Sequence, residues 1–181
     1  MTHMELLLKY MREVMYRMEG KSSRAKALAA IWRHEAGREP GENPELYGDF
    51  LLDFPEELQG GGGSLTPYMR AAWMALTMYV LGGKRHKQDV SLGKAAYECD
   101  SKIGKDSSST KRRLLVVETT SRLEKLDEPL RAVIHMLDSK GISLDYAQLA
   151  VDLANWPKYR LSVVRRWEKD YALKRAKLGA G

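Results

Sequence analysis

Three groups of basic side chains are the residues whose type and spacing best suit a specific chemistry, the binding of phosphate groups. Arginine and lysine hold phosphate oxygens through charge-assisted hydrogen bonds. No predicted helix carries the set of Asn, Gln and Arg side chains expected of a helix that reads bases, so the pattern favours a surface that follows a phosphate backbone. The groups are Lys84, Arg85 and Lys87; Lys111, Arg112 and Arg113; and Lys158, Arg165 and Lys169.

The second group is placed against a local electrostatic preference. A helix is predicted over residues 111–120, which puts Lys111, Arg112 and Arg113 in its first turn. The helix dipole places partial positive charge there and disfavours further cations. A phosphate held by the free amides and flanked by the arginines would account for the placement. Neutralisation by a nearby acid such as Glu98 is the alternative, and both stay open.

Residues suited to catalysis or metal binding do not form recognisable sets. The four histidines, at positions 3, 34, 86 and 135, have no metal-ligand spacing, and no CxxC pair occurs. Nothing orients Cys99 toward His135 as a nucleophile toward its base. Paired acids at 56–57 and 127–128 lie in polar segments and are expected to be solvated. The sequence therefore predicts a protein without catalytic activity, metal or cofactor.

Composition limits which classes of partner and which cellular compartment are expected for this protein. The chain has 181 residues, a formal net charge of +6 and a pI near 9.3, which makes polyanions the first partner class to consider, with solubility as the alternative. The longest apolar run, 71–81, is too short to span a bilayer, and the N-terminus does not resemble a signal peptide. A single cysteine, Cys99, suits a reducing cytoplasm.

Hydrophobic spacing predicts an all-α fold without a β-sheet, arranged as two small packed helical bundles with domains at 1–88 and 89–181. Every sizeable apolar segment has helical spacing, and no alternating run of useful length occurs. The glycine-rich stretch 60–64 is read as a flexible loop, and 100–110 as a mobile loop. Helices are predicted over 4–18, from Ser22 or Ser23 through 31, over 44–52 and 67–81, from Ser91, over 111–120, and across 130–137, where Pro129 either begins the helix or kinks it.

Two helices near the C-terminus carry regularly spaced aromatic residues. Asp145 followed by Gln148 predicts a helix start at Tyr146, and Pro157 suits the first turn of the next helix. The two apolar faces predict an antiparallel pair with both tryptophans in the seam. These faces are Tyr146, Leu149, Leu153 and Trp156, and then Leu161, Val164, Trp167 and Tyr171.

Taken together, these elements resemble the CasB family, the small subunit of the type I-E CRISPR surveillance complex called Cascade. The matching residues are Ser91-Leu92-Gly93-Lys94-Ala95, Arg112-Arg113, Leu130-Arg131, Leu144-Asp145-Tyr146 with Leu149, Asp152-Leu153 and Trp156, and Trp167 with Asp170-Tyr171. The resemblance implies an all-helical subunit without enzymatic activity, present in two copies beside a large subunit, backbone subunits, guide RNA and target DNA. It also implies stabilisation of the R-loop and the displaced strand.

The resemblance also implies a set of nucleic-acid-binding positions. The residues carried over are Arg33, Lys84, Arg85, Lys87, Lys94, Arg112, Arg113, Arg131 and Lys158. Thr119 stands where a relative has arginine, and Tyr146 replaces the commoner tryptophan. For Arg131, a structural salt bridge to Asp145 or Asp152 is the alternative to a phosphate contact. A helical protein-interaction module and a helix-turn-helix regulator remain the alternative functions.

Overall fold

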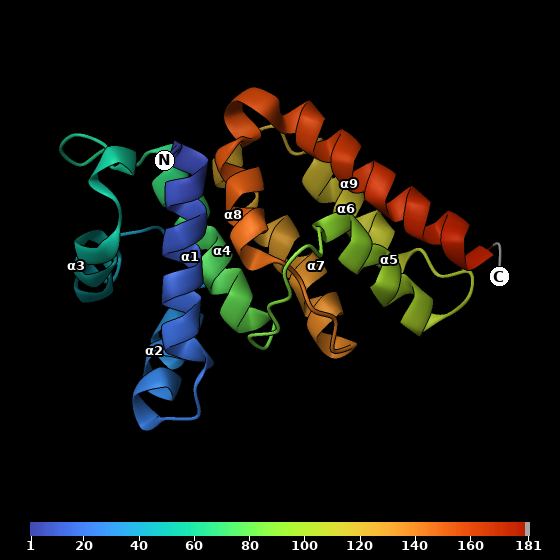
Figure 1. Cartoon of the computed structure of the whole chain (residues 1–181), viewed down its shortest axis with the longest axis horizontal. Coiled ribbons are helices and arrows are strands. Elements are labelled where there is room, and N and C mark those ends of the chain that lie inside the picture. The colour runs from blue at the N-terminus through green and yellow to red at the C-terminus, as the bar shows by residue number, and fades with distance from the viewer. Residues whose placement is uncertain (180–181) are drawn as a thin grey trace.

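The computed structural model describes residues 1–179, and this part of the chain is built from helices without a β-strand (Figure 1). The α-helices are α1 (His3–Glu19), α2 (Ser23–His34), α3 (Pro44–Asp53), α4 (Pro67–Leu81), α5 (Leu92–Ile103), α6 (Ser109–Thr119), α7 (Asp127–Ser139), α8 (Tyr146–Ala154) and α9 (Trp156–Gly179). Two short 3₁₀ helices, η1 (Glu56–Leu58) and η2 (Leu123–Lys125), lie in the connections. The predicted all-α fold is confirmed.

Most helices begin where a short polar side chain closes the first turn. Thr2 and Glu5 form a reciprocal capping box on α1. The side chains of Ser22, Asn43, Thr66, Ser91 and Asp145 each accept a hydrogen bond from the backbone amide three residues on. Proline occupies the first position of α3 and α4. These local signals explain why the caps Ser22 and Ser91 and the helix starts at Pro44, Pro67 and Tyr146 were predicted correctly.

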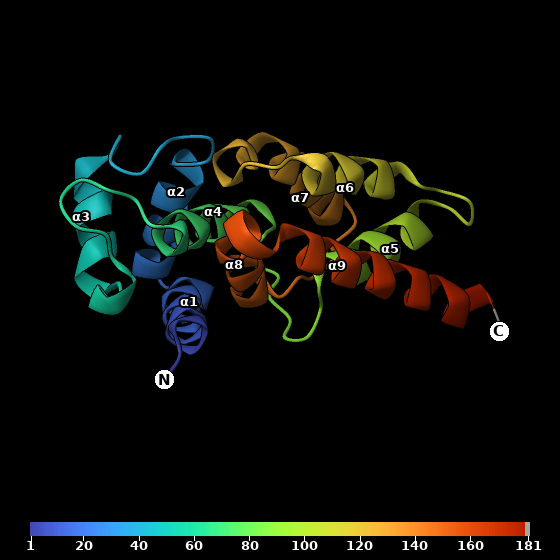
Figure 2. The same cartoon turned by 90° about the horizontal axis from the view of Figure 1, so that it is seen from above.

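Helix α4 forms the centre of the molecule, as its apolar sequence predicted. Its residues from Ala71 to Val80 are all buried, and it packs on α1, α2, α7 and α8 (Figure 2). Helix α8 in turn packs on α1 and α4, so contacts cross the predicted boundary at residue 88. A continuous cluster of buried apolar side chains extends from α1 to α9. The division into domains 1–88 and 89–181 stays a prediction.

The segment 100–110 is not the mobile loop that its serines and lysines suggested. Residues 100–103 form the last turn of α5, and Ser109 and Thr110 already belong to α6. Asp100 is buried, at 1% exposure, because its carboxylate binds the first amides of α6. Composition alone did not show that a buried acid fastens the two helices together. Pro129 lies in the first turn of α7, the position where proline begins a helix without distorting it.

Helices α8 and α9 do not form the predicted antiparallel pair, and both tryptophans belong to α9, one on each side of its break at Tyr159. The rings of Trp156 and Trp167 lie 5.5 Å apart at 36°, so both are in one seam. Helix α8 packs mainly on α4, and α9 lies along α5 (Figure 1). A break at Tyr159 (φ −128°, ψ 26°) shifts the buried face. Val163 is therefore buried, and Leu161, predicted to be buried, is exposed.

Helix α5 approaches α9 closely because of a glycine. A Cβ atom on Gly93 would collide with the backbone carbonyl of Trp167. The neighbouring Ser91 hydroxyl, besides capping α5, donates to the carboxylate of Asp170 at 2.6 Å. Residues far apart in the sequence are joined at this seam, and it holds α9 in place.

Candidate nucleic-acid interface

Helices α6 and α9 lie side by side in opposite directions, and together they carry two of the predicted cationic groups. The ammonium of Lys111, near the start of α6, pairs with Glu168 in the middle of α9. At the other end of α6, Arg160 Nη1 donates to the carbonyl of Glu118 at 2.7 Å. The indole of Trp156 also donates to the carbonyl of Thr120 at 2.9 Å, which anchors the start of α9 to the end of α6.

The N-terminal amides of α6 are occupied by a carboxylate of the protein itself. Asp100 accepts from the amides of Thr110 at 2.8 Å and Lys111 at 3.0 Å, and from the hydroxyl of Tyr171 at 3.0 Å. Of the two alternatives, a phosphate held by these amides is therefore not supported, because Asp100 already occupies them. The alternative of a neutralising acid holds, but the acids are Asp100 and Glu168 rather than Glu98. The first turn of α6 is a structural joint.

The arginines that follow Lys111 diverge from each other. Successive helical residues are rotated by about 100°, and Lys111 and Glu118 face α9. Arg112 therefore lies on the outward side of α6, whereas Arg113 lies on the side farther from α9 and donates to the carbonyl of Ser109 at 3.1 Å. Two arginines on different faces cannot hold one phosphate together. Arg112 is exposed, and its side chain has no protein partner within residues 1–179.

The same rotation applies to Arg165 and Lys169 of α9. Both lie on the side of α9 away from the buried Val163, Trp167 and Tyr171, and both are exposed. Lys158 is also exposed and lines the same hollow as Arg165. In the described part of the chain none of these side chains forms an ion pair. We call Arg112, Lys158, Arg165 and Lys169 the α6–α9 face.

A second set of predicted cations is held by backbone carbonyls near the end of α4. Arg33 Nη2 lies 3.5 Å from the carbonyl of Val80, and Lys84 donates to the carbonyl of Met18 at 3.0 Å. Arg85 donates to the carbonyl of Gly82 at 3.2 Å and pairs with Asp138 at 2.5 Å. Carbonyls at helix C-termini carry partial negative charge, which these cations satisfy. Lys87 is exposed beside them.

Lys94 and Arg131 are also engaged by the protein. Lys94 donates to the carbonyl of Asp89 at 3.1 Å. Arg131 pairs with Asp127, one turn earlier on α7, at 2.7 Å. The predicted partners Asp145 and Asp152 are wrong, because Asp145 caps α8 and Asp152 pairs with Arg166. The structure thus separates the predicted residues into cations held by the protein and cations without a protein partner in residues 1–179, which are Lys87 and those of the α6–α9 face.

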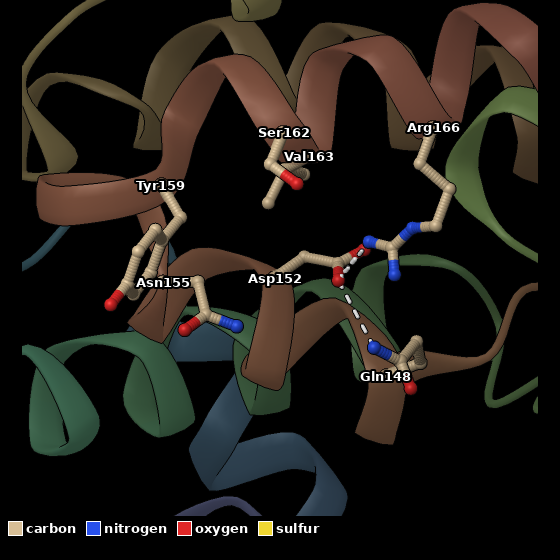
Figure 3. Close-up of a pocket in the computed structure, with 7 residues that line it drawn as sticks. All are labelled: Gln148, Asp152, Asn155, Tyr159, Ser162, Val163 and Arg166. Atoms are coloured by element: carbon tan, nitrogen blue, oxygen red, sulfur yellow. Dashed lines mark hydrogen bonds and ion pairs between the residues drawn. The ribbon is translucent and has the colours of Figure 1, made fainter.

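Sequence reasoning missed the residues at the turn between α8 and α9, which we call the elbow. Tyr159 is 60% exposed there, and Arg160 follows it. Two hollows flank this tyrosine, of about 490 Å³ and about 230 Å³. The smaller one lies between α8 and α9 (Figure 3). The Trp156-Pro157 pair marked a helix start, but no sequence signal showed that Tyr159, two residues later, leaves helical geometry.

A buried cluster of charged groups lies under the α6–α9 face. Glu118 is 4% exposed, and burial together with a hydrogen bond shared with Glu168 raises the pKa of its carboxyl to about 8. Burial opposes ionisation of Glu168 too, but hydrogen bonds from Glu118 and Lys111 outweigh it and lower its pKa. Glu118 therefore carries a proton at neutral pH, and Glu168 the charge that pairs with Lys111.

The remaining chemical candidates are packing groups in this structure. Cys99 is fully buried, its thiol donates to the carbonyl of Met136 at 3.4 Å, and burial raises its pKa. His135 is exposed one residue away from that carbonyl. Within residues 1–179 no group of three or more His, Cys, Asp or Glu side chains could hold a metal ion. No helix described is long and apolar enough to cross a membrane.

Several solved structures share this fold. The structure is similar to CasB from Thermobifida fusca, with TM-score 0.70 and 22% identity over 93% of this chain and 96% of that one. CasB from Thermus thermophilus gives TM-score 0.68 and 21% identity over 95% and 99%. A chain of a CRISPR RNA-guided surveillance complex gives TM-score 0.75 and 19% identity over 96% and 98%.

The amino-acid sequence carries the signature of a protein family. Among curated proteins no sequence matches. The sequence profile of the family described as CRISPR-associated protein Cse2 matches residues 27–171, which is most of the chain. The match covers all the elements on which the resemblance to CasB was based, from Ser91 to Tyr171. The chain therefore belongs to the CRISPR-associated Cse2 family, also called CasB.

Proposed function

We propose that this protein is a non-catalytic small subunit of a type I-E Cascade complex in the cytoplasm, where it binds nucleic-acid backbone without reading sequence. The observation that carries the proposal is the α6–α9 face. Its exposed cations have no acidic partner in the described part of the chain, although the seam beneath them is built from ion pairs. Free cations on a rigid surface suit phosphates, whose neutralisation releases condensed counterions.

Family membership supports the place of this function in a larger assembly. The structure of a CRISPR RNA-guided surveillance complex contains a chain of the same fold. We therefore propose contacts with the large and backbone subunits and with a second copy of this chain. In such a complex, base pairing between guide RNA and target DNA reads the sequence. The RNA–DNA duplex is about as stable as the DNA duplex that it replaces, so modest protein contacts to the backbone are enough to favour the R-loop. The free cations would hold the displaced strand or the target strand in this exchange.

The geometry favours this function over a helix-turn-helix regulator. A recognition helix presents bidentate side chains such as Asn, Gln and Arg to base edges in the major groove. The outer side of α6 instead presents Leu115, Val116 and Thr119 next to Arg112, and Leu115 and Val116 are 43% and 56% exposed. We accordingly expect binding without a preferred operator sequence.

A paired charge replacement tests the proposal. The double variant Arg112→Ala/Lys169→Ala should bind duplex DNA more weakly, and the slope of log K against log salt should fall by about 0.9 for each phosphate that the variant no longer neutralises. The matched control, Arg12→Ala/Arg24→Ala, removes two exposed cations from α1 and α2 and the same net charge. Fluorescence anisotropy over a series of salt concentrations measures the DNA binding of both double variants and distinguishes between them. Equal slopes in both variants would remove the α6–α9 face from the interface.

A further inference from the structure

The elbow between α8 and α9 presents an aromatic ring outward. Tyr159 is 60% exposed, and its backbone (φ −128°, ψ 26°) interrupts the helical geometry of α9. Its amide donates to the carbonyl of Asn155 at 2.7 Å, which holds the backbone in this bend. Within residues 1–179 the phenol hydroxyl has no hydrogen-bond partner. An exposed, fixed tyrosine ring offers a flat apolar face with no protein group to cover it.

One side of Tyr159 faces a hollow of about 490 Å³ that gathers positive charge. Lys158, Arg160 and Arg165 line it, and no acidic side chain does. Arg160 is fixed in place because one of its nitrogens donates to the carbonyl of Glu118. Lys158 and Arg165 are exposed and form no ion pair in the described part of the chain. This hollow suits phosphate groups.

The other side of Tyr159 faces a smaller polar hollow of about 230 Å³ that carries little net charge. Asp152 at its base is neutralised by Arg166 and also accepts from Gln148 at 3.0 Å (Figure 3). Asn155 and Ser162 project into the hollow, and their side chains have no hydrogen-bond partner within residues 1–179. A free amide offers both a donor and an acceptor, which is the combination that the edge of a nucleobase requires.

We propose that the elbow binds one nucleotide of an unpaired strand, with its base stacked on Tyr159, its base edge against Asn155 and Ser162, and its phosphates against Lys158 and Arg165. The proposal deepens the backbone-binding function and rests on it. Bases in a duplex are stacked on one another and do not reach a tyrosine ring, whereas the bases of a single strand stack readily on aromatic side chains, whatever the sequence of the strand. The elbow therefore distinguishes a single strand from a duplex.

The stacking can be tested by measuring how tightly the full chain binds oligo(dT) and a fully abasic strand of the same length. The two probes have the same phosphates and differ only in their bases. Stacking on an aromatic side chain is worth about 1–3 kcal/mol per base, so Tyr159→Ala should weaken oligo(dT) binding at least about fivefold. The same variant should bind the abasic strand and a duplex as the wild type does. Tyr159→Phe should keep the affinity for oligo(dT).

Matched controls separate the ring from the charges. Tyr16→Ala removes a tyrosine that is 77% exposed on α1 and should leave all three affinities unchanged. Lys158→Ala/Arg165→Ala should weaken binding of oligo(dT) and abasic strand by equal factors and lower the salt dependence of both. Equal losses of oligo(dT) and abasic binding in Tyr159→Ala, or no loss of either, would overturn the stacking while leaving the backbone-binding function intact. A wild type that binds none of the probes would overturn both proposals.

Discussion

The helices at the two ends of the chain are held together by different physical means. Around α3 and α4 the contacts are aromatic: Phe50 lies 4.8 Å from Phe54 and 5.4 Å from Trp73, ring centre to ring centre, and Trp73 lies 4.7 Å from Trp32. Around α5, α6 and α9 the contacts are buried charges and hydrogen bonds. Asp100, Glu118 and Asp152 are each at most 4% exposed there. We call these regions the aromatic core and the polar seam.

This difference shows how a small basic protein can offer free cations without losing its fold. In the polar seam Asp100 is matched by backbone amides and Asp152 by Arg166 and the indole of Trp167 at 2.9 Å, whereas burial beside Glu168 raises the pKa of Glu118 and keeps it protonated. The acids are thereby used internally and stay away from the outer surface. The cations of the α6–α9 face are consequently left for an external partner.

The largest expected effect comes from a cavity in the aromatic core. Phe50 is 3% exposed, and its replacement by alanine should lower the free energy of unfolding by about 3–5 kcal/mol. No charged group takes part in its ring contacts, so the loss should be the same at pH 6 and pH 9. Urea unfolding at both pH values measures it. Leu52→Ala on the same helix is the control, because Leu52 is 85% exposed and should cost little.

A smaller effect is expected from the joint between α5 and α6 in the polar seam. Asp100→Ala leaves the amides of Thr110 and Lys111 and the hydroxyl of Tyr171 without their acceptor. Leaving a buried donor unpaired costs about 1–3 kcal/mol, and hydrogen exchange in the first turn of α6 should become faster. Asp106→Ala, an exposed acid in the same connection, is the control. If both variants unfold at the same urea concentration, the carboxylate of Asp100 is not what holds α6 to α5.

The difference between the aromatic core and the polar seam also explains how well the sequence predicted each region. Caps and the spacing of apolar residues are local, so the starts of α3, α4 and α8 and the buried face of α4 were predicted correctly. The polar seam depends on partners far apart in the chain. Lys111 with Glu168, and Asp100 with Tyr171, have no signature in spacing. Lys84, Arg85 and Arg131 were predicted as nucleic-acid contacts from the resemblance to the family, and their bonds to helix ends and to nearby acids could not be read from the sequence.

The effect most specific to the polar seam is expected from Glu118→Gln. The pKa of Glu118 is raised from 4.5 to about 8 in the folded protein, so the native state binds more protons than the unfolded state between these values. Its contribution to stability is therefore fully present below about pH 4.5 and is lost as pH rises toward 8. Glutamine imitates the protonated carboxyl, so the variant should match the wild type below about pH 4.5 and be more stable than the wild type above it.

Between pH 6 and pH 9 only Glu118 of the acid pair changes its charge, because the pKa of Glu168 is lowered and this group is already ionised. The free energy of unfolding should accordingly fall with rising pH more steeply in the wild type than in Glu118→Gln. Urea unfolding at intervals across this range gives both slopes. Glu128→Gln, an exposed acid on α7, should keep the wild-type slope. Parallel slopes in all three proteins would mean that Glu118 is ionised at neutral pH, and the shared proton would have to be abandoned as the link between α6 and α9.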